Sequence, residues 1–345
     1  MVPTGWRTRS RPRNSTGRIL HPPSGGRAQA MVGEPVTFTS VRAVPNRGRW
    51  LRERLTAILP QVVLAPSLLA TLVYVFVFSG WTIWISLSNS TLLPDYSISG
   101  FHHYMELWSN RRWSIAYTNL FLFTSLYVIG ATAIGLLLAI LIDQRIRAEA
   151  LWRTIYLYPL AISFVVTGTV WRWLLSPSTG VESFIRQLGW TSFKFDWLVN
   201  REMAIYTVVI TGIWQASGFV MALFLAGLRS VDPDLIKAAQ IDGASMPRIY
   251  RRIILPAIGP IFVAVLVVLL QSAIKIFDLV VALTGGGPGI ATTVPSIYVY
   301  DLMFQRGQMA EGAAAAMMIL FALLLVLVPY AIWSNWHQRR EASRG

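Results

Sequence analysis

Cysteine is absent from the 345 residues, and histidine occurs only four times. The lack of cysteine excludes disulfides, thiolate catalysis and every cysteine-based metal site. The histidines are His21, His102, His103 and His337, all outside the long apolar segments, and no pair has the i, i+4 spacing of a helical metal site. The sequence therefore predicts no bound metal.

Signatures of catalysis are missing as well. The chain has no Gly-x-x-x-x-Gly-Lys-[Ser/Thr] pattern, so it carries no phosphate-binding loop of its own. No group of acid–base residues or metal ligands gathers beside one end of the apolar segments, which an integral-membrane enzyme would need. We expect no catalytic residue and no cofactor in this chain.

Charge is scarce too. Only 13% of the residues are charged, whereas a soluble domain has about 25%. Several windows of about 20 residues lack charge almost completely, which is the length that crosses about 30 Å of hydrocarbon. The apolar runs are continuous and do not alternate, so helices are favoured over a barrel. The sequence predicts an all-α integral membrane protein with about six spans, near Val62–Leu87, Asn119–Ile142, Tyr156–Leu175, Met203–Leu228, Ile258–Leu283 and Gly312–Trp333.

The net charge of +14 would suggest nucleic acid in a soluble protein. Here most Lys and Arg residues lie before the first span, between the second and third, between the fourth and fifth, and after the last. Basic residues collect on the cytoplasmic side of membrane proteins. The pattern predicts that both termini are cytoplasmic and that nucleic acid is not a partner.

The expected domains follow from this topology. Residues 1–55 are rich in Arg, Pro, Gly and Ser, which predicts a disordered cytoplasmic tail that anionic membrane lipid attracts. Residues 56–336 form the transmembrane domain, and residues 337–345 form a second cytoplasmic tail. In the connection after the third span, Val181, Phe184, Ile185 and Leu188 are spaced as one helical face, and Gly189 follows. This short helix is expected to lie on the membrane surface or to meet a partner.

The connection at residues 229–256 is the most patterned of the polar stretches. Asp232 before Pro233 is a good N-cap, and Gly243 permits a sharp turn before a second helix begins near Met246–Pro247. Small residues in the first helix allow another surface to approach closely. From these residues alone, an ordinary helical hairpin and a docking site are equally open.

Lys237-Ala-Ala-Gln-Ile-Asp-Gly-Ala244, with Ile254-Leu-Pro256 after it, resembles the cytoplasmic "EAA" loop of ATP-binding-cassette (ABC) import permeases. Lys237 stands where that family has Glu, while the small residues and the glycine are kept. The resemblance implies that this loop couples the chain to an ATPase subunit. The coupling residues it implies are Lys237, Ala238, Ala239, Asp242, Gly243 and Ala244.

Further segments resemble the first permease of bacterial glucose/mannose uptake systems, within the maltose-type carbohydrate family. They are Asn89–Pro94, Arg153–Pro159, Trp214–Phe219, Phe277–Pro288 and Arg306–Met309. The resemblance implies the type I ABC importer permease fold in a bacterial inner membrane. It implies a heterodimer with a second permease, a pair of ATPase subunits that bind ATP and Mg, an extracytoplasmic solute-binding protein, and a mono- or small oligosaccharide as substrate.

The fifth expected span contains Gln271, Lys275 and Asp278, spaced by four and three residues, which predicts one polar helical face. Lys275 and Asp278 can pair there, and the face either lines a solute pathway or forms a structural ion pair with the second permease. Matching to maltose-type permeases implies pathway positions in three spans. They are Leu160, Phe164, Gln215, Phe219, Lys275 and Ile276.

Two alternatives to a glucose/mannose permease stay open on the sequence. One is an ABC permease for another polyol or glycoside. The other is an ion-coupled secondary transporter that uses Lys275 and Asp278 as a relay, although such a protein has no need of the loop at 229–256.

Overall fold

The computed structural model describes residues 47–144 and 146–342, so most of the predicted tail at residues 1–55 lies outside the described residues. The chain divides into two structural units, Met1–Leu64 and Ala65–Gly345. Every cavity and loop discussed below belongs to the second unit. Within the described residues the secondary structure is helical, apart from an isolated bridge between Ser88 and Ile98.

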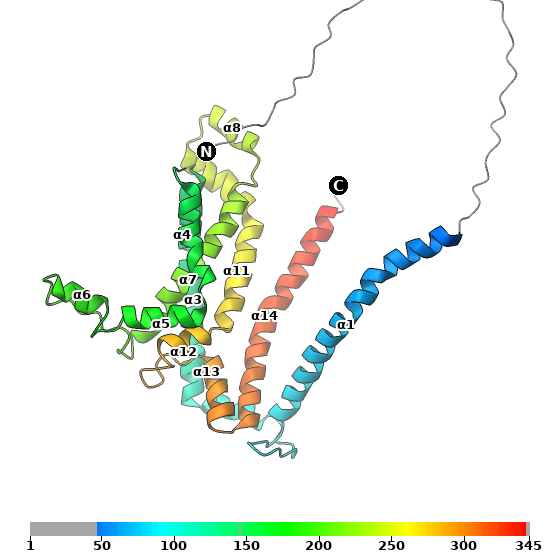
Figure 1. The fold of residues 1–345 in the computed structure, drawn as a ribbon, viewed down its shortest axis with the longest axis vertical. Coiled ribbons are helices and arrows are strands. Elements are labelled where there is room, and N and C mark those ends of the chain that lie inside the picture. The colour runs from blue at the N-terminus through cyan, green and yellow to red at the C-terminus, as the bar shows by residue number, and fades with distance from the viewer. Residues whose placement is uncertain (1–46, 145, 343–345) are drawn as a thin grey trace, which may run out of the picture. The chain divides into compact units, whose positions relative to one another are not determined.

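Among the described residues, four helices are long and apolar enough to cross a membrane by themselves (Figure 1). They are α1 (Arg47–Ser86), α3 (Arg111–Asp143), α7 (Ala204–Leu228) and α14 (Met309–Ala342). Each covers the corresponding predicted span to within one residue at either end. The helix α1 begins at Arg47, inside the segment that was predicted as tail.

The third predicted span, Tyr156–Leu175, is not one helix. It consists of α4 (Glu149–Ala161) and α5 (Phe164–Leu174), which are bent by 100° at the break between them. Pro159 lies in the last turn of α4 and has no N–H for the helical ladder. Ser163 then caps α5 by accepting a hydrogen bond from the Val166 N–H at 3.3 Å. A proline and a cap together turn the chain sharply.

The fifth predicted span, Ile258–Leu283, is also wrong as a single helix. The structure has α11 (Gly259–Ile274) and α12 (Asp278–Leu283), with residues 275–277 outside both. No proline or glycine lies at this break, and its hydrogen bonds are local, with the Phe277 N–H donating to the Lys275 carbonyl at 2.8 Å. The side chains of Lys275 and Asp278 therefore lie at the ends of two different helices.

The segment before α11 is helical in short pieces. These are α8 (Pro233–Ile241), α9 (Met246–Ile249), the π-helical turn η1 (Tyr250–Ile254) and α10 (Leu255–Ala257). The run from Met246 to Ala257 is bent by 66° from α11. Proline at 256 and 260 explains the irregularity, since neither residue can donate to the preceding turn.

Shorter elements complete the order. They are α2 (His102–Ser109), α6 (Val181–Gln187), α13 (Pro295–Tyr300) and the π-helical turn η2 (Asp301–Gln305). The amphipathic segment predicted after the third span is confirmed as α6, and Gly189 ends it with φ at +107°. Phe184 and Leu188 are exposed, while the buried residue of α6 is Glu182, which binds Arg186 at 2.7 Å.

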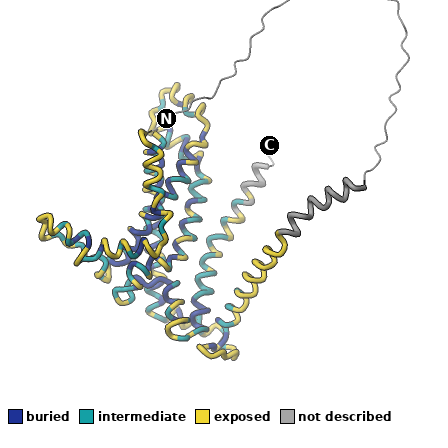
Figure 2. Tube along the Cα trace, viewed as in Figure 1, coloured by how far each residue is buried: buried dark blue, intermediate teal, exposed yellow. Residues whose placement is uncertain are grey.

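The core lies between α3 and α7 and extends to α11 and the α9–η1 segment. Figure 2 shows buried positions gathered along these helices, whereas the described part of α1 is exposed. Glycines let α3 and α7 approach closely, because a Cβ at Gly130 or Gly135 would overlap Ile213 or Val220. The apolar faces of α1 and of α14 beyond Ala315 are largely uncovered in this chain, so they face lipid or another subunit.

A second cluster joins α2, α3, α13 and α14 around Trp113 and Tyr298. Arg112 binds Asp301 at 2.6 Å, and the Tyr298 hydroxyl donates to Glu311 at 3.0 Å. Burial, with the neighbouring Glu311 carboxylate, raises the pKa of Tyr298 well above its ordinary value, so the phenol keeps the proton that it donates. These polar contacts fix the end of the molecule opposite α8 (Figure 1).

The close packing around Gly218 predicts how a substitution there changes the stability of the protein. A Cβ at Gly218 would overlap the backbone carbonyl of Tyr156 in α4, and backbone cannot move aside as a side chain can. We expect Gly218→Ala to destabilise the protein by about 1–3 kcal/mol or more. The measurement is the melting temperature of the detergent-purified protein.

The matched control is Gly80→Ala on α1, where a Cβ would meet nothing within 4 Å. That change should leave the melting temperature unchanged or slightly higher, because alanine has the better helix propensity. Equal effects of the two variants would contradict the described contact between α4 and α7.

Candidate functional site

Two cavities lie along α11, beside the two helix breaks. The Lys275 cavity, of about 270 Å³, is lined by Phe123, Tyr127, Phe164, Gly212, Ser272, Lys275, Ile276, Phe277, Asp278 and Leu279. The Gln215 cavity, of about 420 Å³, is lined by Tyr127, Leu160, Ile162, Ser163, Phe164, Gln215, Ala216, Phe219, Val268, Leu269 and Ser272. The two share Tyr127, Phe164 and Ser272, so they adjoin one another.

The cavities gather all but one of the predicted pathway residues. Lys275, Ile276 and Asp278 line the first cavity, and Leu160, Gln215 and Phe219 line the second. Phe164 lines both, whereas Gln271 lines neither. Contact of these side chains with a solute stays a prediction, but their convergence from α4, α5, α7 and the α11–α12 break is a property of the fold.

The predicted pairing of Lys275 with Asp278 is wrong. Among the described residues no ion pair joins them. The spacing of three residues places two side chains on one face only within a continuous helix, and the helix breaks between these two. Both are exposed at the cavity, so each charge is free to meet solvent or a ligand.

Tyr127 and Ser272 were not predicted from the sequence. Tyr127 stacks on Phe123 one turn away, with ring centroids 5.1 Å apart and planes at 17°. Gly212 faces both rings, and a Cβ there would come within 3.3 Å of each. The sequence signal for Tyr127 was its i, i+4 spacing from another aromatic residue within the second span. The same spacing is common in helices that only face lipid, so it did not identify a cavity residue.

Gln215 connects a cavity to a helix break. Its amide nitrogen donates to the Ile162 carbonyl at 2.8 Å, which satisfies a group that the bend between α4 and α5 leaves exposed. Its amide oxygen is buried and has no partner among the described residues. A buried acceptor of this kind favours a hydroxyl or amide donor.

The loop at residues 229–256 has the predicted local structure. The Asp232 side chain caps α8 by accepting from the Asp234 N–H at 2.9 Å, and Pro233 is the first helical residue. Gly243 has φ at +76°, which other residues rarely adopt. Lys237, which replaces the family's Glu, binds Asp234 at 2.9 Å on the exposed side of the helix.

The predicted coupling residues do not all face outward. Lys237, Ala238, Asp242 and Gly243 are exposed, whereas Ala244 is half-buried. Ala239 is buried in this chain's own core. The outward apolar side chains of α8 are Leu235 and Ile241, which are 55% and 86% exposed. Exposed apolar residues at the tip of a polar loop indicate a docking face.

The loop is attached firmly to the helices that line the cavities. Ile249 and Ile254 are buried in the core, and the Tyr250 hydroxyl donates to Asp143 at 3.1 Å. Arg229 binds Glu149 at 2.8 Å and lies 3.8 Å from Asp143. These contacts join the end of α7 and η1 to the ends of α3 and α4.

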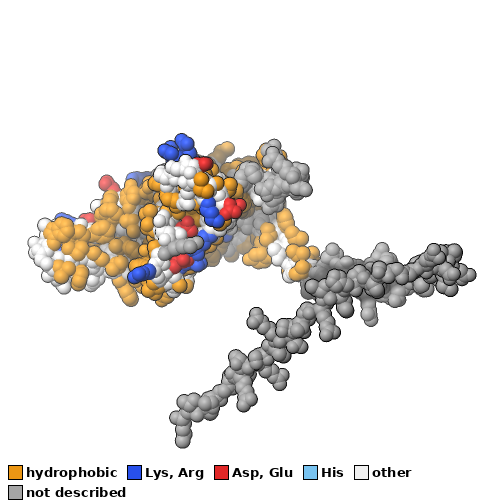
Figure 3. Space-filling model, turned by 90° about the horizontal axis from the view of Figure 1, so that it is seen from above, with side chains coloured by type: hydrophobic (Ala, Val, Ile, Leu, Met, Phe, Trp, Pro, Cys, Tyr) orange, Lys and Arg blue, Asp and Glu red, His pale blue; other side chains and the backbone are white. Residues whose placement is uncertain are grey.

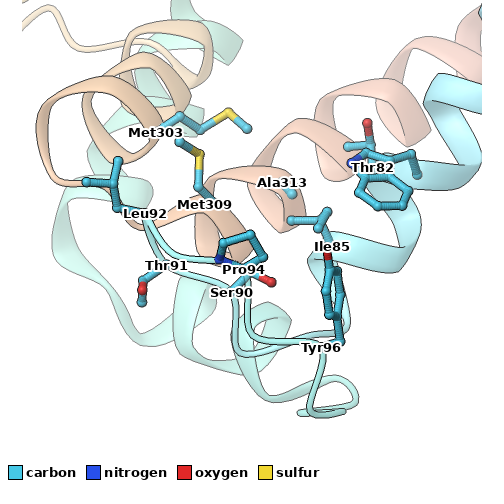
Figure 4. Close-up of a pocket in the computed structure, with 11 residues that line it drawn as sticks. Thr82, Ile85, Ser90, Thr91, Leu92, Pro94, Tyr96, Met303, Met309 and Ala313 are labelled. Atoms are coloured by element: carbon cyan, nitrogen blue, oxygen red, sulfur yellow. The ribbon is translucent and has the colours of Figure 1, made fainter.

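A further cavity, of about 270 Å³, shares no residue with the first two. Figure 4 shows its lining from the end of α1, the connection at 87–100, η2 and the start of α14, including Tyr96, Met303 and Met309. None of its lining residues is charged. It differs in this respect from the Lys275 cavity, which has both a Lys and an Asp side chain in its lining.

Residues 131–342 match the family described as "binding-protein-dependent transport system inner membrane component". The chain belongs to this family. The permease is 37% identical to a probable ABC transporter permease of Pyrococcus horikoshii, over 82% of this chain and 98% of the relative. It is 38% identical to a xylose/arabinose import permease of Haloferax volcanii, over 69% of this chain and 75% of the relative.

A solved structure supports the same fold. It is the bacterial alginate ABC transporter in complex with an alginate pentasaccharide-bound periplasmic protein, matched with a TM-score of 0.66 and 25% identity. The match covers 83% of the permease and 97% of that chain. The permease is thus a multi-pass, all-α membrane component of a binding-protein-dependent ABC importer, and not an enzyme.

The separate positions of Lys275 and Gln271 allow a paired test. Lys275→Met removes a charge at the cavity, and a lost charge-assisted hydrogen bond to solute should lower uptake roughly 10–100-fold. Since Lys275 has no ion pair with Asp278, complex yield should not fall. Uptake of labelled glucose or mannose by cells with the complete transporter is the measurement.

Gln271→Met is the control, because Gln271 lines neither cavity. This variant should keep uptake within about twofold of the parent value. A change of that size is far smaller than the loss expected when one hydrogen bond to a charged group is removed. Full uptake by Lys275→Met, or equal losses in the two variants, would contradict the assignment of the Lys275 cavity to the solute pathway.

Proposed function

We propose that the permease forms half of the translocation pathway of a sugar importer, for a mono- or small oligosaccharide of the glucose/mannose type. The observation that carries this proposal is the pair of adjoining cavities that share Tyr127, Phe164 and Ser272. They bring aromatic rings and polar groups together beside two broken helices, which is where irregular backbone is tolerated in membranes.

The lining suits a sugar. Hydroxyl groups need paired donors and acceptors, while the apolar faces of a pyranose ring favour aromatic side chains. Gln215 offers a buried acceptor, Ser272 a hydroxyl, and Lys275 with Asp278 a free donor and a free acceptor. Tyr127, Phe164 and Phe219 supply the rings. Ligand pockets usually have about 300–1,000 Å³. The Lys275 cavity, of about 270 Å³, is slightly below that range and the Gln215 cavity, of about 420 Å³, is near its lower end, as each half of a shared pathway would be.

A second permease completes the pathway in this proposal. The described part of α1 is mostly exposed before its last turn, and α14 has no buried position among its described side chains after Ala315. Apolar faces of that size need lipid or another membrane helix. A heterodimer would close the open sides of both cavities.

Coupling to ATP runs through α8. A pair of ATPase subunits, which bind ATP and Mg, receives Leu235, Ala238 and Ile241 in a groove and moves the loop when it closes. The Arg229 and Tyr250 contacts pass that movement to α3, α4 and α7. The cavities then open alternately to the two sides of a bacterial inner membrane, and the solute-binding protein delivers the sugar from outside.

Two alternatives to a glucose/mannose permease were left open by the sequence. The relatives named for xylose/arabinose and for alginate show how widely substrates vary among similar chains, so another polyol or glycoside is the second candidate. Ion coupling through Lys275 and Asp278 is set aside, because the chain belongs to a binding-protein-dependent family and the two groups do not form a relay pair.

The substrate test uses the purified complete transporter with its binding protein. Glucose, mannose, xylose, arabinose, glycerol phosphate and an alginate oligosaccharide are each added with ATP. We expect glucose or mannose to stimulate ATP hydrolysis at least about fivefold over the basal rate, which is about 1 kcal/mol of coupling. If only another glycoside stimulates ATP hydrolysis, the protein is still a sugar importer, but the glucose/mannose assignment is wrong.

The coupling test changes Ile241, which is 86% exposed and makes little contact in its own chain. Ile241→Asp places a charge in the proposed ATPase groove, where burial without a partner costs several kcal/mol. We expect the ATPase subunit to copurify at least tenfold less, with transport lost and the permease still in the membrane.

Leu188→Asp is the matched control, since Leu188 is 72% exposed and follows α6, far from the loop in the chain. It should leave ATPase copurification unchanged. If Ile241→Asp retains the ATPase subunit as well as the parent protein does, α8 is not the docking element. Ala239→Arg is unsuitable for this purpose, because Ala239 is buried in the permease itself.

A further inference from the structure

Three arginines form a basic cavity beside the loop. Arg248, Arg251 and Arg252 line a hollow of about 380 Å³ together with Pro247 and no other described residue. All three side chains are exposed. Figure 3 looks onto this end of the molecule and shows Lys and Arg side chains standing among hydrophobic ones. We call this feature the arginine hollow.

The arginine hollow differs from the other basic residues nearby. Arg229 binds Glu149 and approaches Asp143, Arg153 lies 3.8 Å from Glu149, and Lys237 binds Asp234. Within the described residues, none of the three arginines of the hollow has an ion pair. Three cations held together without an acid repel one another, so the site favours an anion from outside the chain.

The backbone holds these arginines in place. Positions 248, 251 and 252 share one face of the α9–η1 segment, whereas Ile249 and Ile254 on the other face are buried in the core. The π-helical turn precedes Pro256, which has no N–H to offer, and the Leu255 N–H donates to the Tyr250 carbonyl. The guanidinium groups are therefore presented by a fixed scaffold and not by a loose tail.

The position of the hollow relative to the lipid headgroups follows from its distance to α11 and from the bend between the two segments. Arg252 precedes the apolar helix α11 by seven residues, which is about 10 Å along a helix. The polar headgroup layer is about 5–7 Å thick on each side of the hydrocarbon, so a straight extension of α11 would carry Arg252 beyond it. The bend of 66° turns the segment out of line with α11, which brings Arg252 closer to the hydrocarbon than a straight helix would and within reach of the headgroups.

We propose that the arginine hollow binds the phosphate headgroup of an anionic phospholipid in the leaflet on the α8 side, which is the cytoplasmic leaflet under the proposed function. Guanidinium groups bind phosphate in bidentate fashion, and basic pockets beside membrane helices select anionic headgroups. A lipid is favoured over the ATPase because the outward face of α8 is apolar, while the hollow lies toward α11 and the membrane.

The consequence concerns coupling. A lipid in the hollow holds η1 at the membrane surface, while η1 also contacts Asp143 at the end of α3 through Tyr250. The loop then pivots against the membrane when α8 is moved. In this proposal, the bound anionic lipid takes part in coupling ATP hydrolysis to transport, in addition to being part of the surrounding membrane.

The test measures lipid retained by the full-length permease in its purified complex, by native mass spectrometry, during titration with phosphatidylglycerol or phosphatidylcholine. The parent protein should prefer phosphatidylglycerol at least tenfold. Each arginine beside an anionic headgroup strengthens binding roughly fivefold, so Arg248→Gln, Arg251→Gln and Arg252→Gln together should weaken it about one hundredfold. The double variant Arg251→Gln, Arg252→Gln should weaken it about twenty-fivefold and serves if the triple variant assembles poorly.

The control removes three charges elsewhere, with Arg111→Gln, Arg147→Gln and Arg201→Gln, which are also exposed and have no ion pair among the described residues. It should change phosphatidylglycerol binding less than twofold. Equal losses in both sets would overturn the proposal in favour of general surface charge. Displacement of the lipid by millimolar inorganic phosphate would show a small-anion site instead.

The proposal and the proposed function fail separately. If the hollow variants lose the ATPase subunit but keep phosphatidylglycerol, the hollow docks protein and the lipid assignment is wrong. If they lose phosphatidylglycerol and keep the ATPase subunit, the lipid assignment stands whichever sugar is transported.

Discussion

One hydrogen bond supports much of the candidate pathway. A helix that breaks within a membrane exposes backbone carbonyls where water is scarce, and each unsatisfied group costs several kcal/mol. The Gln215 amide donates to the Ile162 carbonyl at 2.8 Å and satisfies the bend between α4 and α5. The bend of 100° turns Leu160 and Phe164, from its two sides, toward α7. Without a polar side chain at position 215, that bend would carry an unpaired group and the Gln215 cavity would lose its shape.

The same helices connect the cavities to the loop. Tyr127 is on α3, Gln215 is on α7, and the other ends of these helices meet Arg229 and Tyr250 through Asp143 and the end of α7. The glycines of α3 also allow α3 and α7 to pack closely along their length. In the proposed mechanism, these contacts pass a displacement of α8 to the cavity walls.

The long spans, the Asp232 cap and the turn at Gly243 were predictable from the sequence, because each depends on residues that are close together in the chain. The breaks were less so. Pro159 signalled the first, but nothing in the local sequence marks residues 275–277, and there the assumption of a continuous helix wrongly paired Lys275 with Asp278. The inward direction of Ala239 and the cavity roles of Tyr127 and Ser272 depend on tertiary packing, which a single sequence does not reveal.

The most direct test of the pathway uses the absence of cysteine from this chain. Ser272 lines both cavities, so Ser272→Cys introduces a single reporter thiol at their junction. Its labelling rate with a small, charged thiol reagent is measured in the complete transporter with and without saturating substrate. The pathway account predicts that the thiol is labelled, and that substrate slows labelling at least fivefold while a thiol at position 80 is unaffected. Labelling of Ser272→Cys that is absent, or that substrate leaves unchanged, would contradict it.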